Sequence, residues 1–289
     1  MKQYRSVFPV VKMSVALDVS ESGYFDWLKR NPSETTMRRD RLRADIREQF
    51  DLHGGMAGSP TITDDLREKT EWTSISRTRI AREMKAMNLR CKTKRRFTVT
   101  TDSKHNEPVA DNLLNRKFNQ KMPDRVWVSD ITYLRVKSYW VYLVMFIDLF
   151  SRKVVGWDLS GSLAASSTIT ALEKAVWLRK PPGGLVIHSD RGIQYACEAF
   201  REKIKDHKLV QSMSRKGNCW DNACAESFFS TLKTRLTHHR TYETMDELRR
   251  DLYWYIEIYY NRYRKHTANN GMTPEQKELY YKQEKIKCA

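Results

Sequence analysis

Three acidic residues in this chain have the types and the surroundings that metal-dependent phosphate chemistry requires. Asp130 interrupts a run rich in β-branched and aromatic residues, Asp190 follows a short apolar run, and Glu226 lies in a helical pattern. A carboxylate in a central strand is costly to bury unless it shares a cation with other acids. Mg²⁺ prefers such oxygen ligands and keeps positions open for water and phosphate. Two such ions can clamp an in-line displacement at phosphorus. A lone acid, by contrast, is usually a solvated surface charge.

Two further side chains belong to the helical pattern around Glu226. Lys233 follows it by nearly two helical turns, so both charges share one face, and Asn222 lies one turn before it. Two other acids are left out of the metal set. Asp148 ends an apolar run before a turn, and Asp221 stands at the start of the Glu226 helix, where an acid is electrostatically favourable.

The charge of the whole chain indicates a polyanionic partner. The 289 residues include 52 Lys and Arg against 35 Asp and Glu, which gives a formal net charge of +17. Binding to DNA along much of the chain, with a strong salt dependence, fits this excess. RNA, anionic lipid or a merely solvated basic surface fits it too, because charge alone does not separate these. The length has room for two domains, and the 40% of hydrophobic residues excludes a disordered chain.

The cysteines and the apolar runs exclude several other classes of protein. Five cysteines form no Cys-x-x-Cys pair, so neither a disulfide framework nor a common zinc module is favoured. No apolar run approaches the length of a membrane span, and the amino terminus lacks the features of a signal peptide. We therefore expect a cytoplasmic protein that has no membrane partner.

The second part of the chain, residues 123–289, has the pattern of an α/β catalytic domain with a helical extension at its carboxyl end. Three β-rich runs at 126–136, 139–148 and 153–159 predict antiparallel strands. A helix at 166–179 with Trp177 inward, a strand at 185–188, a helix at 197–207, a strand at 209–213 and the Glu226 helix follow. A long helix is predicted from 245 to about 260. This is the order of a ribonuclease H-like fold with a mixed five-stranded sheet, which places Asp130 beside Asp190.

The first part of the chain predicts a small all-α module. Residues 1–32 predict a helical segment, and residues 33–90 predict three helices that form a helix-turn-helix domain. Arg77, Arg79 and Arg82 lie on the third helix, where they would contact DNA. A helical bundle with a solvated basic face is the alternative. Residues 91–122 form a basic connector, which either lies along phosphates or is a flexible linker.

Other basic residues are candidate DNA contacts. Arg262 and Arg264 stand in a run in which aromatic and basic residues alternate, as they do in many nucleic-acid contacts and also at solvated helix ends. Arg191 and His188 flank Asp190. Three roles stay open for these two residues: orientation of the Asp190 carboxylate, contact with a phosphate, or a purely structural role.

The spacing of the three acids carries a family resemblance. Between Asp130 and Asp190 lie 59 residues, and 35 lie between Asp190 and Glu226, with Lys233 seven beyond. This resembles the D,D-35-E pattern of retroviral integrases and, more closely, bacterial insertion-sequence transposases of the reading-frame-B type. The similar segments are Trp-x-x-Asp-x-Thr-Tyr at 127–133, His-Ser-Asp-Arg-Gly at 188–192, Gly-Asn-Cys-Trp-Asp-Asn-Ala at 217–223, and the helical module around 53–63 and 80–89.

The resemblance implies a DDE transposase of the integrase superfamily that depends on Mg²⁺ or Mn²⁺, with two ions in each active site. One ion would be held by Asp130 and Asp190, and the other by Asp130 and Glu226. The implied activity is strand cleavage at the element's ends followed by strand transfer, with Lys233 contacting the DNA. The implied partners are the terminal inverted repeats, target DNA and further copies of the chain, and the implied location is the bacterial cytosol with the nucleoid. The product of an upstream reading frame is a further partner, fused or separate.

Two alternatives stay open at this point. The chain could be a non-catalytic DNA-binding regulator of transposition with a degenerate integrase core, although three intact acids argue against this. A ribonuclease H that acts on hybrids shares the acids but has no need of two basic accessory regions.

Overall fold

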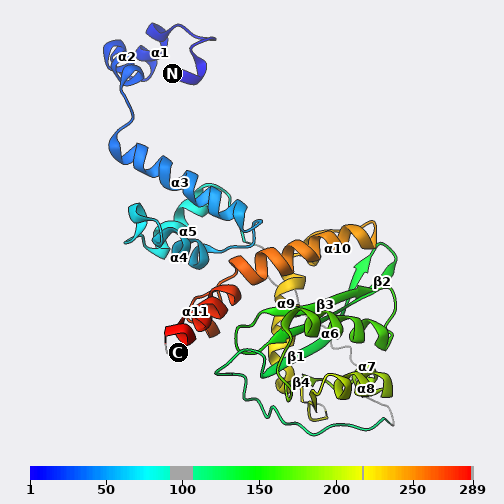
Figure 1. Ribbon diagram of the computed structural model, residues 1–289. Helices are drawn as coiled ribbons and strands as arrows, with labels where there is room; N and C mark the ends of the chain where they lie inside the picture. Colours follow the sequence, from blue (N-terminus) through cyan, green and yellow to red (C-terminus); the bar gives the residue numbers. More distant parts are fainter. Residues whose placement is uncertain (92–106, 217, 288–289) are drawn as a thin grey trace. The chain divides into compact units, whose positions relative to one another are not determined.

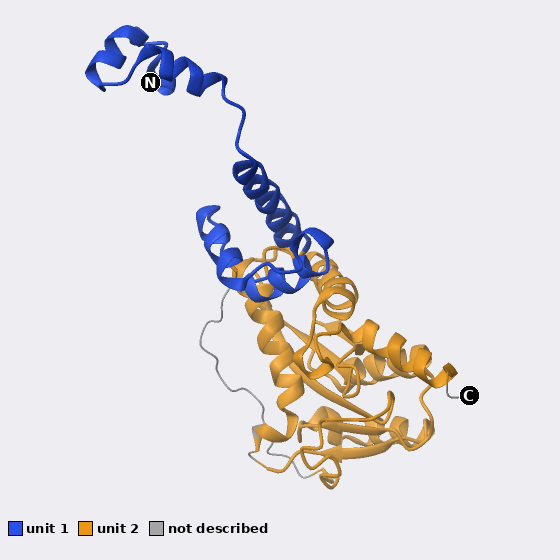
Figure 2. Ribbon diagram, turned by 90° about the vertical axis from the view of Figure 1, so that its left-hand side faces the viewer, with its two compact units in different colours: residues 1–52, 57–90 blue, residues 53–56, 91–289 orange. Residues whose placement is uncertain are grey.

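The computed structural model describes residues 1–91, 107–216 and 218–287. It separates into two compact units, which Figure 2 shows in different colours. Unit 1 comprises residues 1–52 and 57–90, and unit 2 comprises residues 53–56 and 91–289. Most of the basic run at 90–96 lies outside the described residues. None of the described helices is long and apolar enough to cross a membrane.

Unit 1 contains only helices, as the sequence predicts. Its core is formed by the three helices of the module that follows the first 32 residues, with Leu42, Ile46, Ile62, Leu66 and Ile80 fully or almost fully buried. The last of these helices begins after Ser76, whose hydroxyl accepts a hydrogen bond from the backbone N–H of Arg79 at 3.2 Å. The helices are η1 (Lys2–Tyr4), α1 (Val10–Ala16), α2 (Glu21–Lys29), α3 (Glu34–Leu52), α4 (Ser59–Arg67), η2 (Thr70–Trp72) and α5 (Arg77–Ala86).

Unit 2 is built on a mixed five-stranded sheet (Figure 1). Its strand order is β3-β2-β1-β4-β5. The first three strands are antiparallel, and β4 and β5 continue the sheet in parallel with β1. This is the ribonuclease H-like arrangement that the sequence predicts. The strands are β1 (Val126–Val136), β2 (Tyr139–Asp148), β3 (Val154–Ser160), β4 (Val186–Ser189) and β5 (Val210–Met213).

Helices cover both faces of the sheet, because the central strands are apolar on both sides. One hydrophobic cluster joins the sheet to α6 (Ala165–Arg179), α7 (Ile193–Ala196) and α8 (Glu198–Asp206). The other joins it to α9 (Ala223–Arg235) and α10 (Met245–Tyr253). Gly156 on β3 permits the approach of α6, since a Cβ there would lie 2.5 Å from the carbonyl oxygen of Ala171. In the second cluster, α9, the helix that carries Glu226, packs directly on the sheet.

One expectation about the helices was wrong, and another is confirmed with a change of helix type. Trp177 is 79% exposed, because the buried side of α6 carries Ala171, Leu172 and Ala175, and Trp177 lies two residues, about 200°, around the helix from Ala175. The long helix expected from 245 to about 260 changes character at Trp254. It continues as a π-helix, η5 (Trp254–Tyr263). The remaining short helices are η3 (Cys219–Asn222), η4 (Thr237–His239) and η6 (Thr267–Asn269), and α11 (Pro274–Lys287) follows them.

Candidate active site

Asp130 and Asp190 come from neighbouring parallel strands. Val126 pairs with Val186 and Val128 pairs with His188, so the register adds 60 to the residue number. Two residues further along, the same register places Asp130 opposite Asp190, just after β4 ends. Asp130 Oδ1 accepts a hydrogen bond from the backbone N–H of Ile131 at 2.8 Å, and Asp190 Oδ1 accepts one from Gly192 at 2.9 Å. The sheet itself thus brings these two acids together.

Glu226 reaches the same region from α9. The amide of Asn222, just before this helix, donates a hydrogen bond to the backbone carbonyl oxygen of Ser129 at 3.1 Å. Phe228 and Phe229 of the same helix are buried against the sheet, whereas Glu226 is on the exposed side. The helix start is therefore fixed to the residue that precedes Asp130.

The charges of the three acids act on one another. Burial raises the pKa of Asp130 well above its usual value, and the nearby charges of Asp190 and Glu226 raise it further. The hydrogen bond from Ile131 and the charge of Lys233 oppose this rise. Burial also raises the pKa of Glu226. Carboxylates in such surroundings repel one another, and a shared cation relieves the repulsion.

The donor atoms fit a hard divalent ion, because all three side chains offer oxygen. Within the described part of the chain, no three Asp, Glu, His or Cys side chains are gathered tightly enough to hold one metal ion. Asp130, Asp190 and Glu226 are thus electrostatic neighbours without being closed around a single point.

Lys233 lies two turns along α9 from Glu226 and faces the first strand. Its Nζ is 5.0 Å from the centre of the Tyr133 ring. Burial lowers the pKa of Lys233, and the charge of Asp130 opposes that shift. The ammonium group is therefore within electrostatic reach of Asp130 while it also contacts an aromatic ring. The sequence placed Lys233 on the correct helix and included Tyr133 in the motif around Asp130, but it did not predict the contact between the two side chains.

His188 and Arg191 join β4 and the residues just after it to β5 and the residue just after that strand. The His188 ring is buried and contacts the hydroxyls of Ser212 and Ser214, at 2.9 and 3.2 Å from its two nitrogens. Burial lowers the pKa of His188 to about 4, so the ring is neutral at physiological pH. Arg191 donates to the carbonyl oxygen of Ser214 at 2.7 Å. Both contacts hold the loop that carries Asp190.

Asp221 makes several hydrogen bonds that the sequence did not predict. Its buried carboxylate accepts hydrogen bonds from Arg215 at 2.8 and 2.9 Å, from Arg116 at 2.9 Å and from Asn112 at 2.8 Å. The hydrogen bond from Arg215 is the main reason that the pKa of Asp221 is lowered. Asp221 therefore fixes the end of the connector to the start of α9.

Asp148 is also held by the fold. Its carboxylate accepts from the backbone N–H groups of Phe150 and Asp124 at 2.9 and 3.0 Å, and Arg179 lies 3.4 Å away. The sequence predicted that Asp148 caps a turn, and its contact with the backbone N–H of Phe150 is of this kind. Burial raises the pKa of Asp148 to about 7.

The cations expected to contact DNA have different surroundings in the structure. In unit 1, Arg77 and Arg82 are exposed on α5, whereas Arg79 is half-buried and pairs with Glu83 at 3.2 Å. Glu83 also accepts from Arg43 at 2.8 Å, so Arg79 belongs to an internal ion-pair group.

The two carboxyl-terminal arginines belong to unit 2. Arg262 is exposed and lies 3.7 Å from Glu275. Arg264 stacks on the Tyr260 ring at 5.5 Å and contacts His266 at 3.0 Å. The positive charges around His266 add to burial in lowering its pKa to about 2. The alternating aromatic and basic residues of this run are thus partly used in packing.

Comparisons with known proteins agree with this architecture. Residues 120–219 match the integrase core domain family, residues 207–274 match a second integrase core domain family, and residues 37–97 match the HTH-like domain family. These matches define an integrase-core protein with a helix-turn-helix-like domain.

Relatives over nearly the full length identify the family. The chain is 35% identical over 280 residues to transposase InsF for insertion sequence IS3A of Escherichia coli K12, with 96% of both chains covered. The chain therefore belongs to the insertion-sequence transposases of the DDE integrase superfamily, proteins of DNA transposition and integration. This confirms the resemblance seen in the sequence.

Solved structures with a similar fold are more distant. A chain of the simian T-cell lymphotropic virus intasome, in complex with the PP2A regulatory subunit B56 gamma, has a TM-score of 0.48 and 18% identity, covering 81% of this chain and 74% of that one. The HTLV-2 integrase catalytic core domain in complex with magnesium has a TM-score of 0.44 and 20% identity, covering 55% and 99%.

Proposed function

We propose that this transposase cleaves one DNA strand at each end of its element and joins the freed end to target DNA, with Asp130, Asp190 and Glu226 as the residues that hold Mg²⁺ or Mn²⁺. The observation that carries the proposal is the proximity of the three carboxylates, since the charges of Asp190 and Glu226 both act on the buried Asp130. The β1–β4 register places two of them opposite each other, and Asn222 fixes the helix of the third to Ser129. Two divalent ions, when bound, would favour deprotonation of the attacking water and stabilise the leaving oxygen.

The chain's own residues would position the DNA for two successive displacements. In the first, the oxygen of a water molecule bonds to the scissile phosphorus, and the bond from phosphorus to the 3′-oxygen of the element breaks. In the second, that 3′-hydroxyl attacks a phosphodiester of the target, whose own 3′-oxygen leaves. The number of phosphodiester bonds is unchanged in the second step, so it requires no external energy source. Lys233 would hold a phosphate next to Asp130 during both steps.

The expected partners are the terminal inverted repeats, target DNA and other copies of this chain. The formal charge of +17 supports contact with DNA over a large surface. The HTH-like domain, with Arg77 and Arg82 exposed on α5, would recognise the element's ends. A product of an upstream reading frame would supply further DNA-binding or assembly elements.

The test is a nicking and strand-transfer assay on duplexes that carry the element's own ends, with Mg²⁺ or Mn²⁺. We expect Asp130→Asn, Asp190→Asn and Glu226→Gln each to abolish both reactions while DNA affinity changes by less than about threefold, because affinity comes mainly from the cations. Near-normal nicking by any one variant would remove that residue from the site. If the parent protein, tested alone and together with the upstream reading-frame product, binds these ends but never cleaves them, the regulator interpretation is correct.

A further inference from the structure

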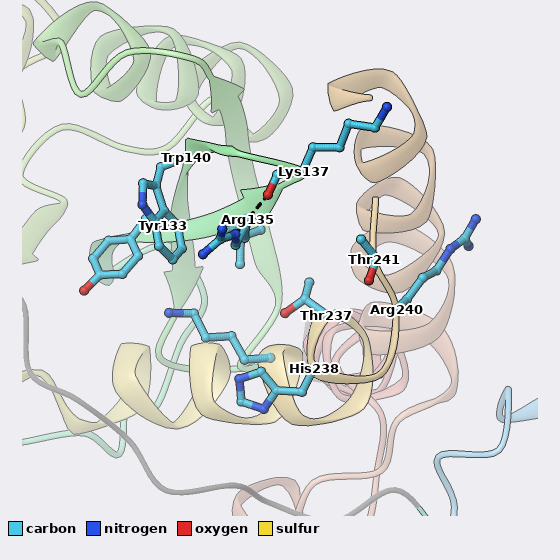
Figure 3. A pocket seen from close by; sticks show the side chains of 10 residues that line it. Tyr133, Arg135, Lys137, Trp140, Thr237, His238, Arg240 and Thr241 are labelled. Carbon is cyan, nitrogen blue, oxygen red and sulfur yellow. Dashed lines mark hydrogen bonds between the residues drawn. The ribbon is translucent and has the colours of Figure 1, made fainter. Parts of the chain in front are cut away.

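A hollow of about 480 Å³ adjoins the active site along the β1–β2 hairpin. Its walls come from the hairpin on one side and from the end of α9 with the following segment on the other (Figure 3). Lys233 is one of its lining residues, and the charge of Lys233 also acts on Asp130. The volume is in the range of about 300–1,000 Å³ that is typical of small-ligand sites. Its lining residues are Tyr133, Leu134, Arg135, Lys137, Trp140, Lys233, Thr237, His238, Arg240 and Thr241.

Aromatic rings form one wall of this hollow. The rings of Tyr133 and Trp140 meet edge to face, with 5.2 Å between their centres. The Arg135 guanidinium lies 5.6 Å from the centre of the Trp140 ring. Figure 3 shows the two side chains near each other. Trp140 is 47% exposed, although a large apolar side chain gains from burial. A wall of rings and guanidinium planes is a surface on which a nucleobase can stack.

The charges that line the hollow favour an anion. The lining residues include four Lys or Arg side chains and no acid. Two of the four are engaged by nearby carboxylates, since Lys137 pairs with Glu243 and Arg240 pairs with Glu247. Arg135 makes no ion pair with an acid anywhere in the described ranges 1–91, 107–216 and 218–287. Its Nε donates to the carbonyl oxygen of Lys137, at 2.9 Å.

We propose that this hollow binds one unpaired nucleotide of a DNA strand, with its base stacked on Trp140 and its phosphate held by Arg135 and Lys233. An unpaired nucleotide fits better than a duplex, because the faces of paired bases are covered by their neighbours and cannot reach an aromatic wall. The inference rests on the proposed function and deepens it. A nucleotide held here stands next to Asp130, so strand separation at the scissile site would be stabilised by binding.

The experiment measures binding without cleavage, using the full chain and no divalent metal. The probes are a blunt duplex and the same duplex with a two-nucleotide single-stranded extension that carries 2-aminopurine, whose fluorescence falls when it stacks. We expect the parent protein to quench the extension. We expect Trp140→Ala to abolish the quenching and to weaken binding of the extended duplex about tenfold, with less than twofold change on the blunt duplex. Trp140→Phe should retain most of both effects.

Controls separate stacking from folding and from general affinity. Trp177→Ala removes another exposed tryptophan, on α6, and should change neither reading. Arg135→Gln should lower the slope of log affinity against log salt by about 0.7 on the extended duplex, the value for one phosphate contact to a single strand. The proposal is overturned if Trp140→Ala weakens both duplexes equally, or if an abasic extension binds as tightly as the natural one, which indicates a phosphate groove only.

Two further arms identify the source of the nucleotide. If quenching occurs only with extensions that carry the element's terminal sequence, the bound nucleotide comes from the transposon end. If unrelated sequences are quenched equally, the hollow also accepts nucleotides of target strands. Both results support the nucleotide site. Failure here is distinct from failure of the proposed function, because the stacking assay contains no metal and the nicking assay of the acid variants does not depend on Trp140.

Discussion

The side-chain amide of Asn222 donates a hydrogen bond to the backbone carbonyl of Ser129 at 3.1 Å, and both residues are buried. This contact joins the beginning of α9 to the residue before Asp130. It spans 93 positions of the sequence. Because Glu226 lies one turn after Asn222, the bond sets where the third carboxylate enters the site.

Loss of the Asn222 amide should therefore impair chemistry more than binding. We expect Asn222→Ala to reduce nicking of element ends about tenfold or more, with DNA affinity nearly unchanged, because an unsatisfied buried carbonyl costs about 1–3 kcal/mol and frees the helix start. The measurement is single-turnover nicking together with equilibrium binding. Ser227→Ala, on the exposed side of the same helix, is the matched control. Equal loss of binding and nicking would argue for general misfolding instead.

Asp221 should contribute to stability in a pH-dependent way. Its pKa is lowered in the folded protein, so the stabilisation is present above its unfolded value of 3.8 and is lost as the pH falls through the folded value. We expect Asp221→Asn to lower the free energy of unfolding at pH 7 by about 1–3 kcal/mol, because Arg215 and Arg116 lose their acceptor.

The check is urea unfolding of parent and variant between pH 3 and pH 7. The difference between the two proteins should shrink towards pH 3, as the parent's carboxylate becomes protonated in the unfolded state. Asp206→Asn, at the end of α8, changes an acid for which no hydrogen bond or ion pair is described, and it should show no such trend. If the free energies of unfolding of the two proteins differed by the same amount at all pH values, Asp221 would stabilise the fold by its shape and not by its charge.

The arginines of α5 should divide into two functions. Arg77 and Arg82 are exposed, so we expect their double alanine variant to lose affinity for element ends and to lower the salt slope by about 1.8, the value for two phosphate contacts on a duplex. Arg79→Ala should instead reduce the stability of the helical module, since Arg79 pairs with the buried Glu83. Fluorescence anisotropy against salt, with thermal unfolding alongside, separates the two effects. An unchanged salt slope in the double variant would show that Arg77 and Arg82 do not contact DNA phosphates.

Much of the sheet was predictable, because the strands carry strong local signals. The runs at 126–136 and 139–148 match β1 and β2 residue for residue, since both are apolar and β-rich and are separated by a short turn. The order of strands and helices then implied that Asp130 and Asp190 are neighbours, and the β1–β4 register agrees. Chain order and side-chain type were sufficient for this part.

The parts that could not be predicted depend on contacts between distant residues. The hydrogen bond from Arg116 to Asp221 joins positions 105 apart, and no local pattern marks it. His188 looked like a candidate site residue because it is next to Asp190. The two serines that contact its ring are more than 20 positions away in the sequence, on β5 and just after it. Trp177 was placed inward because it is apolar, although the closely packed side of α6 uses small residues. Burial in these cases is decided by tertiary packing.

Lys233 gives the most direct test of how the active site holds DNA. Its ammonium group lies 5.0 Å from the Tyr133 ring and within reach of the charge of Asp130. We expect Lys233→Ala to reduce strand transfer about ten- to a hundredfold, the range for losing a hydrogen bond to a charged group. Lys233→Arg should restore much of the activity, because the charge is kept and a guanidinium also stacks on Tyr133.

The assay should follow strand transfer on pre-cleaved ends, with metal dependence measured for both Lys233 variants. An unchanged metal concentration for half-maximal activity would show that the lysine positions phosphate without holding the ions. If Lys233→Arg fails as badly as Lys233→Ala while DNA affinity stays normal, simple phosphate contact is excluded. The compact, strongly hydrated ammonium group would then be required by the space between Tyr133 and Asp130, which a planar guanidinium does not fit.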